Sequence, residues 1–446
     1  GHPGVAGPGS DGGVVARGAV ILGGGLTGLV AAERLAAAGV EVPVIERESE
    51  PGGACRSRTA DGFTFDHTGH LLHVARPETE TYLRQLGVWQ GLEVHQRRAA
   101  VVVGDHITPY PIQIHTHRLA PDVRRDCLLG FVHAWADADD SEPANFRDWV
   151  LDRFGEGFAH HFFFPYNQKL YRARPEELSL DWVGRYVPKP TLEEVVNGAF
   201  GLHRSEVGYN ATFRYPRQGG IRTLPDAVAE RVPGLQLESR VVALHLGERW
   251  LETAAGDRTG FDRLVSTVPL PALLDMLLDD LPGDVARARR ALRWVRVLNL
   301  ALGVDGAAPC DEHWLYIPDP ELPYYRVGFP SNHGDVAPPG CHTVSVEVAL
   351  DPEAGDVDGA ASVAQAALEA AGMLDAERIR VRTVTVLDPA YVVFDLERRD
   401  AVATLRRHLG ERGVMIAGRW AEWKYSAMED AILDGMSVAR RLAGGG

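Results

Sequence analysis

The chain has 446 residues, of which 46 are Lys or Arg and 61 are Asp or Glu, so its formal net charge is −15. With 45% apolar and 24% charged residues, it has the composition of a globular protein, not of a disordered, fibrous or disulfide-rich one. The acidic balance argues against a surface for nucleic acid or anionic membranes, but it leaves room for a local basic pocket that binds one phosphorylated ligand.

Cysteine spacing and hydropathy exclude several further classes. The four cysteines, at positions 55, 127, 310 and 341, form no CxxC pair, so we expect neither a metal site nor a disulfide framework. No apolar run reaches the ~18 residues that a membrane span needs. We therefore expect a cytoplasmic protein without membrane or nucleic-acid partners. Residues 1–15 are rich in Gly and Pro and are predicted to be a disordered tail.

The first predicted elements form a strand, a glycine turn and a helix. The apolar strand Ala19–Leu22 is followed by the turn, by an alanine-rich helix and by a second strand that ends at Glu46. Gly23 allows the tight turn, Gly25 allows the backbone to approach a pyrophosphate, and Gly28 allows the helix to pack on the strand. The helix N-terminus attracts phosphates, and the Glu46 carboxylate can accept hydrogen bonds from ribose hydroxyls. This pattern predicts a dinucleotide-binding unit.

Additional segments favour FAD over NAD. A second glycine segment, Pro51–Ser57, follows the acidic residue, and Ser239–Val242 is similar to a strand that touches adenine. Near the C-terminus, residues 414–419 are predicted to form a strand and turn, and a helix from Met428 to Leu442 follows. Together these segments resemble the glutathione-reductase-like FAD proteins, especially the amine oxidase group. The cofactor contacts that the resemblance implies are Gly23, Gly25, Leu26, Thr27, Gly28, Glu46, Arg47, Gly53, Ala54, Ser57, Gly69, Val242, Gly418, Arg419 and Met428.

Six motifs narrow the family further. They are FDHTGHLLH at 65–73, PYPIQ at 109–113, PYNQKLY at 165–171, WLY at 314–316, YYRV at 324–327 and GRW with WKY between 418 and 425. In this order they resemble UDP-galactopyranose mutases, the eukaryotic-type branch more than the bacterial one. The resemblance covers nearly the whole chain, from Ala19 to Gly435.

The resemblance implies roles for the residues of these motifs. Arg185 and Arg326 would grip a diphosphate, because a guanidinium stays charged and binds phosphate oxygens in bidentate fashion; a surface salt bridge is the alternative. His70 would lie against the flavin ring, while Tyr316 and Tyr425 would offer hydroxyls to phosphate or sugar, or else fill an aromatic core. The implied substrate contacts are Tyr110, Gln113, Asn167, Tyr171 and Asn332.

The chain also departs from the family pattern. Tyr171 stands where the family has a tryptophan that stacks on uracil, Ala427 where bacterial members have an aspartate, and Glu429 where eukaryotic-type members have an asparagine. Tyr110 and Gln113 have odd spacing, so both reach one ligand only if the chain bends between them. The identity of the base and of the sugar therefore stays open.

The function implied by the resemblance is that of an FAD-dependent nucleoside-diphosphate-sugar mutase. Such an isomerase interconverts pyranose and furanose forms without net redox, through an adduct of the sugar with N5 of the reduced flavin. The alternative is an FAD-dependent oxidase or dehydrogenase of the amine oxidase or protoporphyrinogen oxidase type, which has no need of two arginines that grip phosphate. A binding protein with a decayed site is a third reading. NADH or NADPH is a candidate reductant, and an oligomer is compatible with the sequence.

We expect an α/β fold with three domains. Residues 16–76, 208–271 and 401–442 would form a Rossmann-like FAD-binding domain, and residues 77–207 a mainly helical domain with short strands around 101–114. In residues 272–400, apolar residues alternate with others, as in Leu298-x-Leu300-x-Leu302 and Val344-x-Val346-x-Val348. That alternation predicts an antiparallel sheet on the substrate side.

Overall fold

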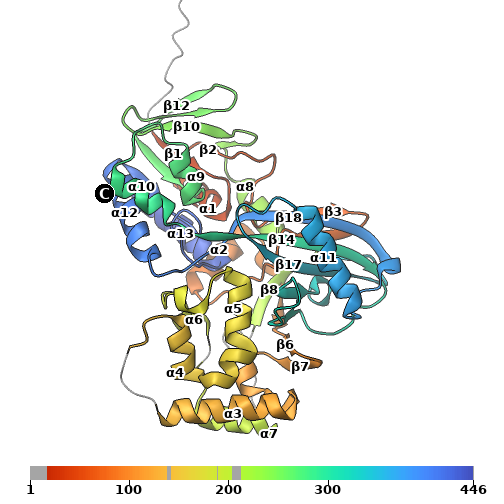
Figure 1. Ribbon diagram of the computed structural model, residues 1–446. Helices are drawn as coiled ribbons and strands as arrows, with labels where there is room; N and C mark the ends of the chain where they lie inside the picture. The colour runs from red at the N-terminus through yellow and green to blue at the C-terminus, as the bar shows by residue number, and fades with distance from the viewer. Residues whose placement is uncertain (1–17, 138–141, 188, 203–211, 445–446) are drawn as a thin grey trace, which may run out of the picture.

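The computed structural model describes residues 18–137, 142–187, 189–202 and 212–444. The predicted tail at residues 1–15 lies outside the described residues. Figure 1 shows a unit around β1 and α1 at the top, a sheet carrying α11 at the side, and a group of helices from α3 to α7 at the bottom. This arrangement confirms the predicted α/β class with a helical part and a substrate-side sheet.

A five-stranded parallel sheet forms the centre of the first unit. All four strand pairings are parallel. The three central strands are buried apart from Ala19 and Arg263, whereas the edge strand at residues 235–236 is partly exposed. The segments that meet in this sheet are far apart in the sequence, but the predicted domain limits themselves stay a prediction. In sheet order the strands are β19 (Val414–Ile416), β13 (Arg263–Ser266), β1 (Ala19–Leu22), β2 (Val44–Ile45) and β9 (Leu235–Gln236).

Helices α1 (Leu26–Ala37) and α13 (Met428–Ala443) pack against each other beside this sheet. A Cβ atom at Gly435 would lie 2.7 Å from the carbonyl oxygen of Thr27, so only glycine permits this approach. The middle of α13 is thereby held against the first turn of α1.

The second large sheet has seven strands and is antiparallel apart from the pairing of β15 with β6. Leu298, Leu300 and Leu302 point toward α11 (Val357–Ala370), together with alternate valines of the neighbouring strand. Because side chains alternate along a strand, the residues between these leucines face the opposite side. In sheet order the strands are β18 (Ile379–Val392), β14 (Trp294–Asp305), β17 (Cys341–Leu350), β16 (Arg326–Gly328), β15 (Trp314–Tyr316), β6 (Ala99–Val103) and β7 (His106–Pro109).

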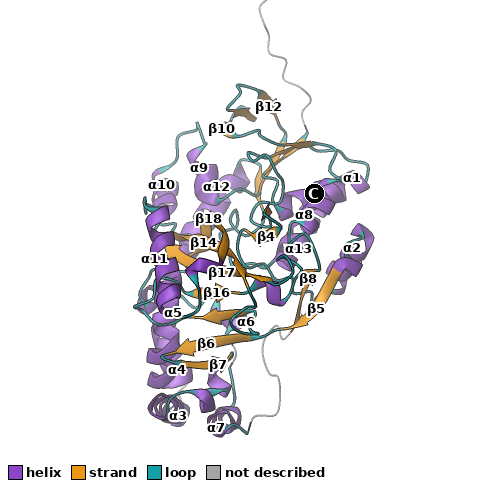
Figure 2. Ribbon diagram, turned by 90° about the vertical axis from the view of Figure 1, so that its right-hand side faces the viewer, coloured by secondary structure: helices purple, strands orange, loops and turns teal. Residues whose placement is uncertain are grey.

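The helical part lies at the end of the molecule opposite the β10–β12 hairpins, as both ribbon views show (Figure 2). Its two long helices cross closely, since a Cβ atom at Gly157 would lie 2.2 Å from the carbonyl oxygen of Asp126. A π-helical turn, Ala159–Phe163, links α4 to α5. The helices are α3 (Pro121–Ala136), α4 (Phe146–Phe158), α5 (Phe164–Tyr171), α6 (Val183–Tyr186) and α7 (Leu192–Phe200).

The other strands and α-helices complete the fold, and none of the helices in the described ranges is long and apolar enough to cross a membrane. The strands are β3 (Ser57–Ala60), β4 (Phe63–Asp66), β5 (Leu92–Gln96), β8 (Thr212–Pro216), β10 (Val241–His245), β11 (Trp250–Thr253) and β12 (Arg258–Gly260). The helices are α2 (Pro77–Leu86), α8 (Thr223–Ala229), α9 (Leu270–Asp275), α10 (Gly283–Arg290) and α12 (Arg398–Glu411).

Candidate active site

The turn between β1 and α1 has the geometry that a dinucleotide needs. Gly23 has a φ of 105°, and a Cβ atom there would lie 2.4 Å from Thr267 Oγ1. A Cβ atom at Gly28 would lie 2.1 Å from the carbonyl oxygen of Gly23. The first turn of α1 carries no acidic residue and no side-chain cap, so its N–H groups suit a phosphate. These features fit the pyrophosphate of FAD.

The second glycine segment lies against the first. The Gly52 N–H donates to the carbonyl oxygen of Gly24 over 2.8 Å, and the nearest atom to a Cβ at Gly25 would be the Cα of Gly53 at 4.0 Å. Glu46, at the end of β2, accepts a hydrogen bond from the Gly24 N–H at 2.6 Å. Glu46, the predicted ribose-binding acid, is therefore fixed beside the turn, and the backbone at Gly25 is open to a ligand.

The C-terminal motif meets the same turn. Gly418 has a φ of 87°, and a Cβ atom there would lie 2.9 Å from Thr27 Oγ1. The guanidinium of Arg419 donates to the carbonyl oxygens of Ser426, at 2.7 Å, and Ala390, at 3.3 Å. Thus Arg419 holds the loop before α13 against the end of β18.

The other predicted cofactor residues differ in their burial and contacts. Leu26, Thr27 and Met428 are buried, whereas Arg47 pairs with Glu48 at the surface. The Ser57 hydroxyl donates to Asp66 Oδ1 over 2.6 Å. Ala54 is half-buried. Val242 is exposed on β10, outside the five-stranded sheet.

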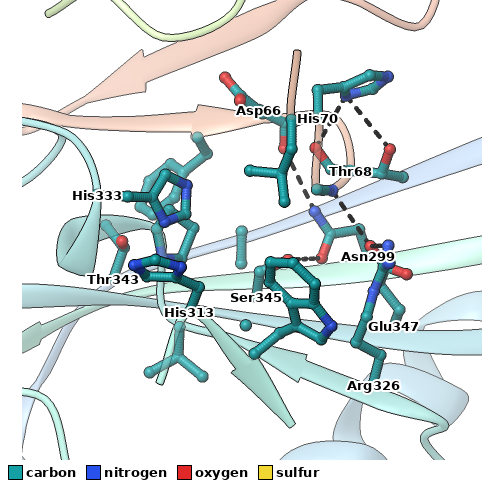
Figure 3. Close-up of a pocket in the computed structure, with 18 residues that line it drawn as sticks. Asp66, Thr68, His70, Asn299, His313, Arg326, His333, Thr343, Ser345 and Glu347 are labelled. Carbon is teal, nitrogen blue, oxygen red and sulfur yellow. Dashed lines mark hydrogen bonds and ion pairs between the residues drawn. The ribbon is translucent and has the colours of Figure 1, made fainter. Parts of the chain in front are cut away.

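The loop after β4 places His70 at the edge of a cavity on the polar face of the seven-stranded sheet (Figure 3). Its Nδ1 lies 3.0 Å from the carbonyl oxygen of Thr68, which can only accept, so Nδ1 carries the proton and Nε2 can accept a hydrogen bond. Burial lowers the pKa of His70, which favours this neutral form. Gly69, next to it, is exposed.

A row of polar side chains crosses four strands of this face. The strand register places Asn299 opposite Glu347, Glu347 opposite Arg326, and Arg326 opposite Tyr316. These are the residues between the apolar positions that face α11. Figure 3 shows Asn299, Glu347 and Arg326 together beneath the loop of Thr68 and His70.

Arg326 and Glu347 form a charged pair. Arg326 Nη2 donates to Glu347 Oε1 over 2.6 Å, and the Tyr325 hydroxyl donates to Oε2 over 2.5 Å. Burial by itself would raise the pKa of Glu347, but the Arg326 guanidinium outweighs it and holds that pKa below the usual value. Burial would likewise lower the pKa of Arg326, but the carboxylate raises it. Both groups are therefore ionised at neutral pH.

A continuous series of tyrosine rings borders this pair. Tyr110 lies 5.1 Å from Tyr316, and Tyr316 lies 5.4 Å from Tyr166, measured between ring centroids. At the other end, Tyr425 stacks on Tyr391 at 6.3 Å. Burial raises the pKa of Tyr110 and Tyr166, so their hydroxyls stay protonated and can donate hydrogen bonds. The complete series is Tyr110, Tyr316, Tyr166, Tyr325, Tyr391 and Tyr425.

The other predicted substrate residues make contacts within the protein. Asn167 donates to the carbonyl oxygen of Phe163 over 2.8 Å, and Asn332 donates to those of Cys310 and Glu312. The Tyr171 ring is buried against Trp182 and Tyr391, so stacking on a base would require this ring to move. Gln113 is also buried, in a 3-10 turn that follows Pro111. Their substrate roles stay predictions.

Arg185 belongs to helix α6, but its side chain lies outside the described residues. Its role as the second diphosphate arginine therefore also stays a prediction.

Several site residues were missed by the sequence reasoning. Tyr166 and Tyr325 belong to the motifs at 165–171 and 324–327, but only other residues of these motifs were predicted as site residues. Glu347 had a detectable signal, because a charged residue interrupts the apolar alternation of a buried strand. The departure at Glu429 also has a structural explanation, since its Oε1 accepts from the backbone N–H groups of Ala75 and Arg76 at 3.0 and 2.8 Å.

A histidine cluster forms one end of the cavity. His313 and His333 lie 5.1 Å apart, and both rings, together with His95, contact Phe213. Burial lowers the pKa of His313 to about 3 and that of His333 well below its usual range. Among the described residues, no group of three or more side chains is arranged to hold a metal ion.

We predict that this cluster makes the protein sensitive to acid. A histidine in an unfolded chain has a pKa of about 6.5, whereas the buried rings have lower values. Between pH ~6.5 and pH ~3 the unfolded chain therefore binds more protons than the folded one. The free energy of unfolding should therefore fall with decreasing pH, by up to about 1.4 kcal/mol per pH unit for each buried histidine. Urea titrations between pH 7.5 and pH 5, about the range in which a free histidine titrates, measure this slope. His333→Leu should flatten it, unlike His106→Gln at an exposed site; equal slopes in all three proteins would contradict the prediction.

Comparisons with known proteins agree with this geometry. A family model described as flavin containing amine oxidoreductase matches residues 26–443. A crystal structure of reduced UDP-galactopyranose mutase superposes with a TM-score of 0.89 and 26% identity, covering 97% of this chain and 96% of that one. A putative protoporphyrinogen oxidase from Exiguobacterium shares the fold, with a TM-score of 0.72 and 16% identity over 97% of this chain and all of that one. The predicted resemblance and the FAD cofactor are thereby confirmed.

Two curated relatives match in sequence. Protoporphyrinogen oxidase 2 of Arabidopsis thaliana is 22% identical over 57% of this chain and 58% of its own length. A probable UDP-galactopyranose mutase of Klebsiella pneumoniae is 25% identical over 36% of this chain and 42% of its own length. The chain thus spans less than two thirds of each of these relatives.

Proposed function

We propose that this chain, which belongs to the family of flavin-containing amine oxidoreductases, is a mutase that interconverts the pyranose and furanose forms of a nucleoside-diphosphate sugar. When bound and reduced, FAD supplies a nucleophilic nitrogen, N5, for attack at the anomeric carbon, with no net redox over the cycle. NADH or NADPH is the proposed source of the electrons.

The single observation that carries the proposal is the ionised Arg326, which lines the cavity beside the Gly69–His70 loop and has Tyr316 and Tyr325 as neighbours. Negative charge grows on the diphosphate as the anomeric bond breaks, and a fixed guanidinium stabilises that charge. A substrate pocket for an amine, which is itself cationic when protonated, gains nothing from such a cation. The similarity to a UDP-galactopyranose mutase over 97% of the chain supports the same assignment.

The tyrosines supply the remaining functions of such a site. The hydroxyls of Tyr316 and Tyr425 can donate to phosphate or sugar oxygens, and the neighbouring rings exclude water that would otherwise capture the activated sugar. Neutral His70 offers an acceptor, Nε2, on the side of the cavity next to the exposed backbone of Gly69. Arg185 is proposed as the second diphosphate ligand.

The proposal is tested by ring isomerisation. Dithionite-reduced holoprotein is incubated with UDP-, TDP- and GDP-hexoses, and the products are separated by chromatography. We expect a new ring isomer with at least one sugar, no isomer with the oxidised enzyme, and no consumption of reductant in proportion to product. Turnover of an amine or a porphyrinogen with no isomerisation of any nucleotide sugar would establish the oxidase alternative instead.

A further inference from the structure

Glu347 connects two parts of the site that come from different regions of the chain. Its Oε1 accepts hydrogen bonds from both Arg326 Nη2, at 2.6 Å, and the backbone N–H of Gly69, at 3.2 Å. Its Oε2 accepts from the Tyr325 hydroxyl. The same oxygen therefore holds the guanidinium and the loop that carries His70.

The two members of this ion pair differ in their exposure. The Glu347 side chain is only 2% exposed, whereas Arg326 is 21% exposed and lines the cavity. A buried carboxylate is tolerated when it is paired and its oxygens accept hydrogen bonds, and Glu347 has three donors. Because the buried Glu347 carboxylate accepts from Nη2 of Arg326, it fixes the orientation of the guanidinium. The edge of the guanidinium that faces the cavity can then reach a ligand.

We propose that Glu347 is a positioning residue that couples the Gly69–His70 loop to the diphosphate-binding side chain of Arg326. This inference rests on the function proposed above. The carboxylate offsets part of the positive charge of Arg326, so it weakens the resting affinity for a diphosphate while fixing the geometry. Its negative charge also lies against the Gly69–His70 loop. If this loop holds the flavin, as the family resemblance implies, the charge would disfavour the added negative charge of the reduced cofactor.

Two measurements on purified holoprotein test the inference. Glu347→Gln keeps the shape and the acceptor for Gly69 and Arg326 but removes the charge. We expect it to bind UDP more tightly, by about threefold to tenfold, because an uncompensated partly buried cation attracts the anion more strongly. We also expect a more positive flavin reduction potential and a lower kcat. Glu347→Asp, which keeps the charge, should restore the wild-type potential.

A double-mutant cycle tests whether Glu347 acts on UDP binding through Arg326 or through a general effect on the fold. In an Arg326→Met background, Glu347→Gln should leave the UDP affinity unchanged, because the residue acts through the guanidinium. Glu33→Gln is the matched control, since Glu33 is a buried carboxylate paired with Arg34 on α1, away from the cavity. It should change neither the UDP affinity nor the potential.

The possible outcomes are distinct. Wild-type UDP affinity together with a wild-type potential in Glu347→Gln would overturn the inference, as would an equal change in Glu33→Gln. If the wild-type protein binds none of UDP, TDP or GDP, the proposed function fails. In that case the potentials of Glu347→Gln and Glu347→Asp still decide whether the Glu347 charge acts on the loop and its cofactor.

Discussion

Replacement of Arg326 by Met is expected to lower kcat/KM for the nucleotide sugar by about 30-fold to 1,000-fold, because a donor aimed at a developing anion contributes about 2–4 kcal/mol. The same change should destabilise the protein. It leaves the Glu347 carboxylate buried without its cation, and breaking a buried ion pair from one side costs about 3–5 kcal/mol.

A second variant separates these two effects. Arg326→Met combined with Glu347→Gln has no buried charge and keeps an acceptor for the Gly69 N–H, while its amide NH2 can donate to the Tyr325 hydroxyl oxygen. It should regain most of the lost free energy of unfolding, measured by denaturant titration, without regaining activity. Recovery of activity in the double variant, or near-normal turnover of Arg326→Met, would remove this arginine from the catalytic site.

Gly25→Ala is expected to weaken FAD binding while sparing the apoprotein. A Cβ atom at this position meets nothing closer than the Cα of Gly53 at 4.0 Å, and the φ of −73° suits any residue. The methyl group would occupy the space where the backbone approaches a pyrophosphate. The FAD affinity should fall by at least about tenfold, which corresponds to about 1.4 kcal/mol.

The measurements are the unfolding transition of the apoprotein and the quenching of flavin fluorescence on titration. Gly28→Ala should behave differently and destabilise the apoprotein itself, because its Cβ would collide with the Gly23 carbonyl at 2.1 Å. Gly410→Ala, on α12 with no neighbour within 4 Å, is the control for a glycine change that touches nothing. Unchanged FAD affinity in Gly25→Ala would contradict the assignment of this turn to the pyrophosphate.

The two sheets differ in how well the sequence predicted them. The alternation of Leu298, Leu300 and Leu302 indicated a strand with one apolar face, and β14 has that face against α11. The alternation did not say which strand lies beside it. β15 pairs with β6, a strand from the segment predicted to be mainly helical. The two strands are more than 200 residues apart in the sequence, so no local pattern could predict this contact.

In the candidate site too, the sequence predicted the residues but not what surrounds them. Arg326, Tyr110, Tyr316 and Tyr425 were chosen by motif, and in the structure they lie along one series of contacts. Tyr171 was chosen by the same reasoning, yet its ring packs into the core. A motif fixes the residue type and its position along the chain, whereas the exposure of a ring depends on the helices and strands packed around it.

The sequence by itself determined the cofactor turn, because its glycines, helix start and acid interact within about one βαβ unit, and local backbone geometry leaves few alternatives. Only the tertiary structure decided the partner of Arg326. Strand register sets Glu347 opposite it, and the packing of the loop on the sheet brings in Gly69 from 278 residues away. Hydrogen bonds between such distant residues depend on how whole elements pack, so no window of sequence contains them.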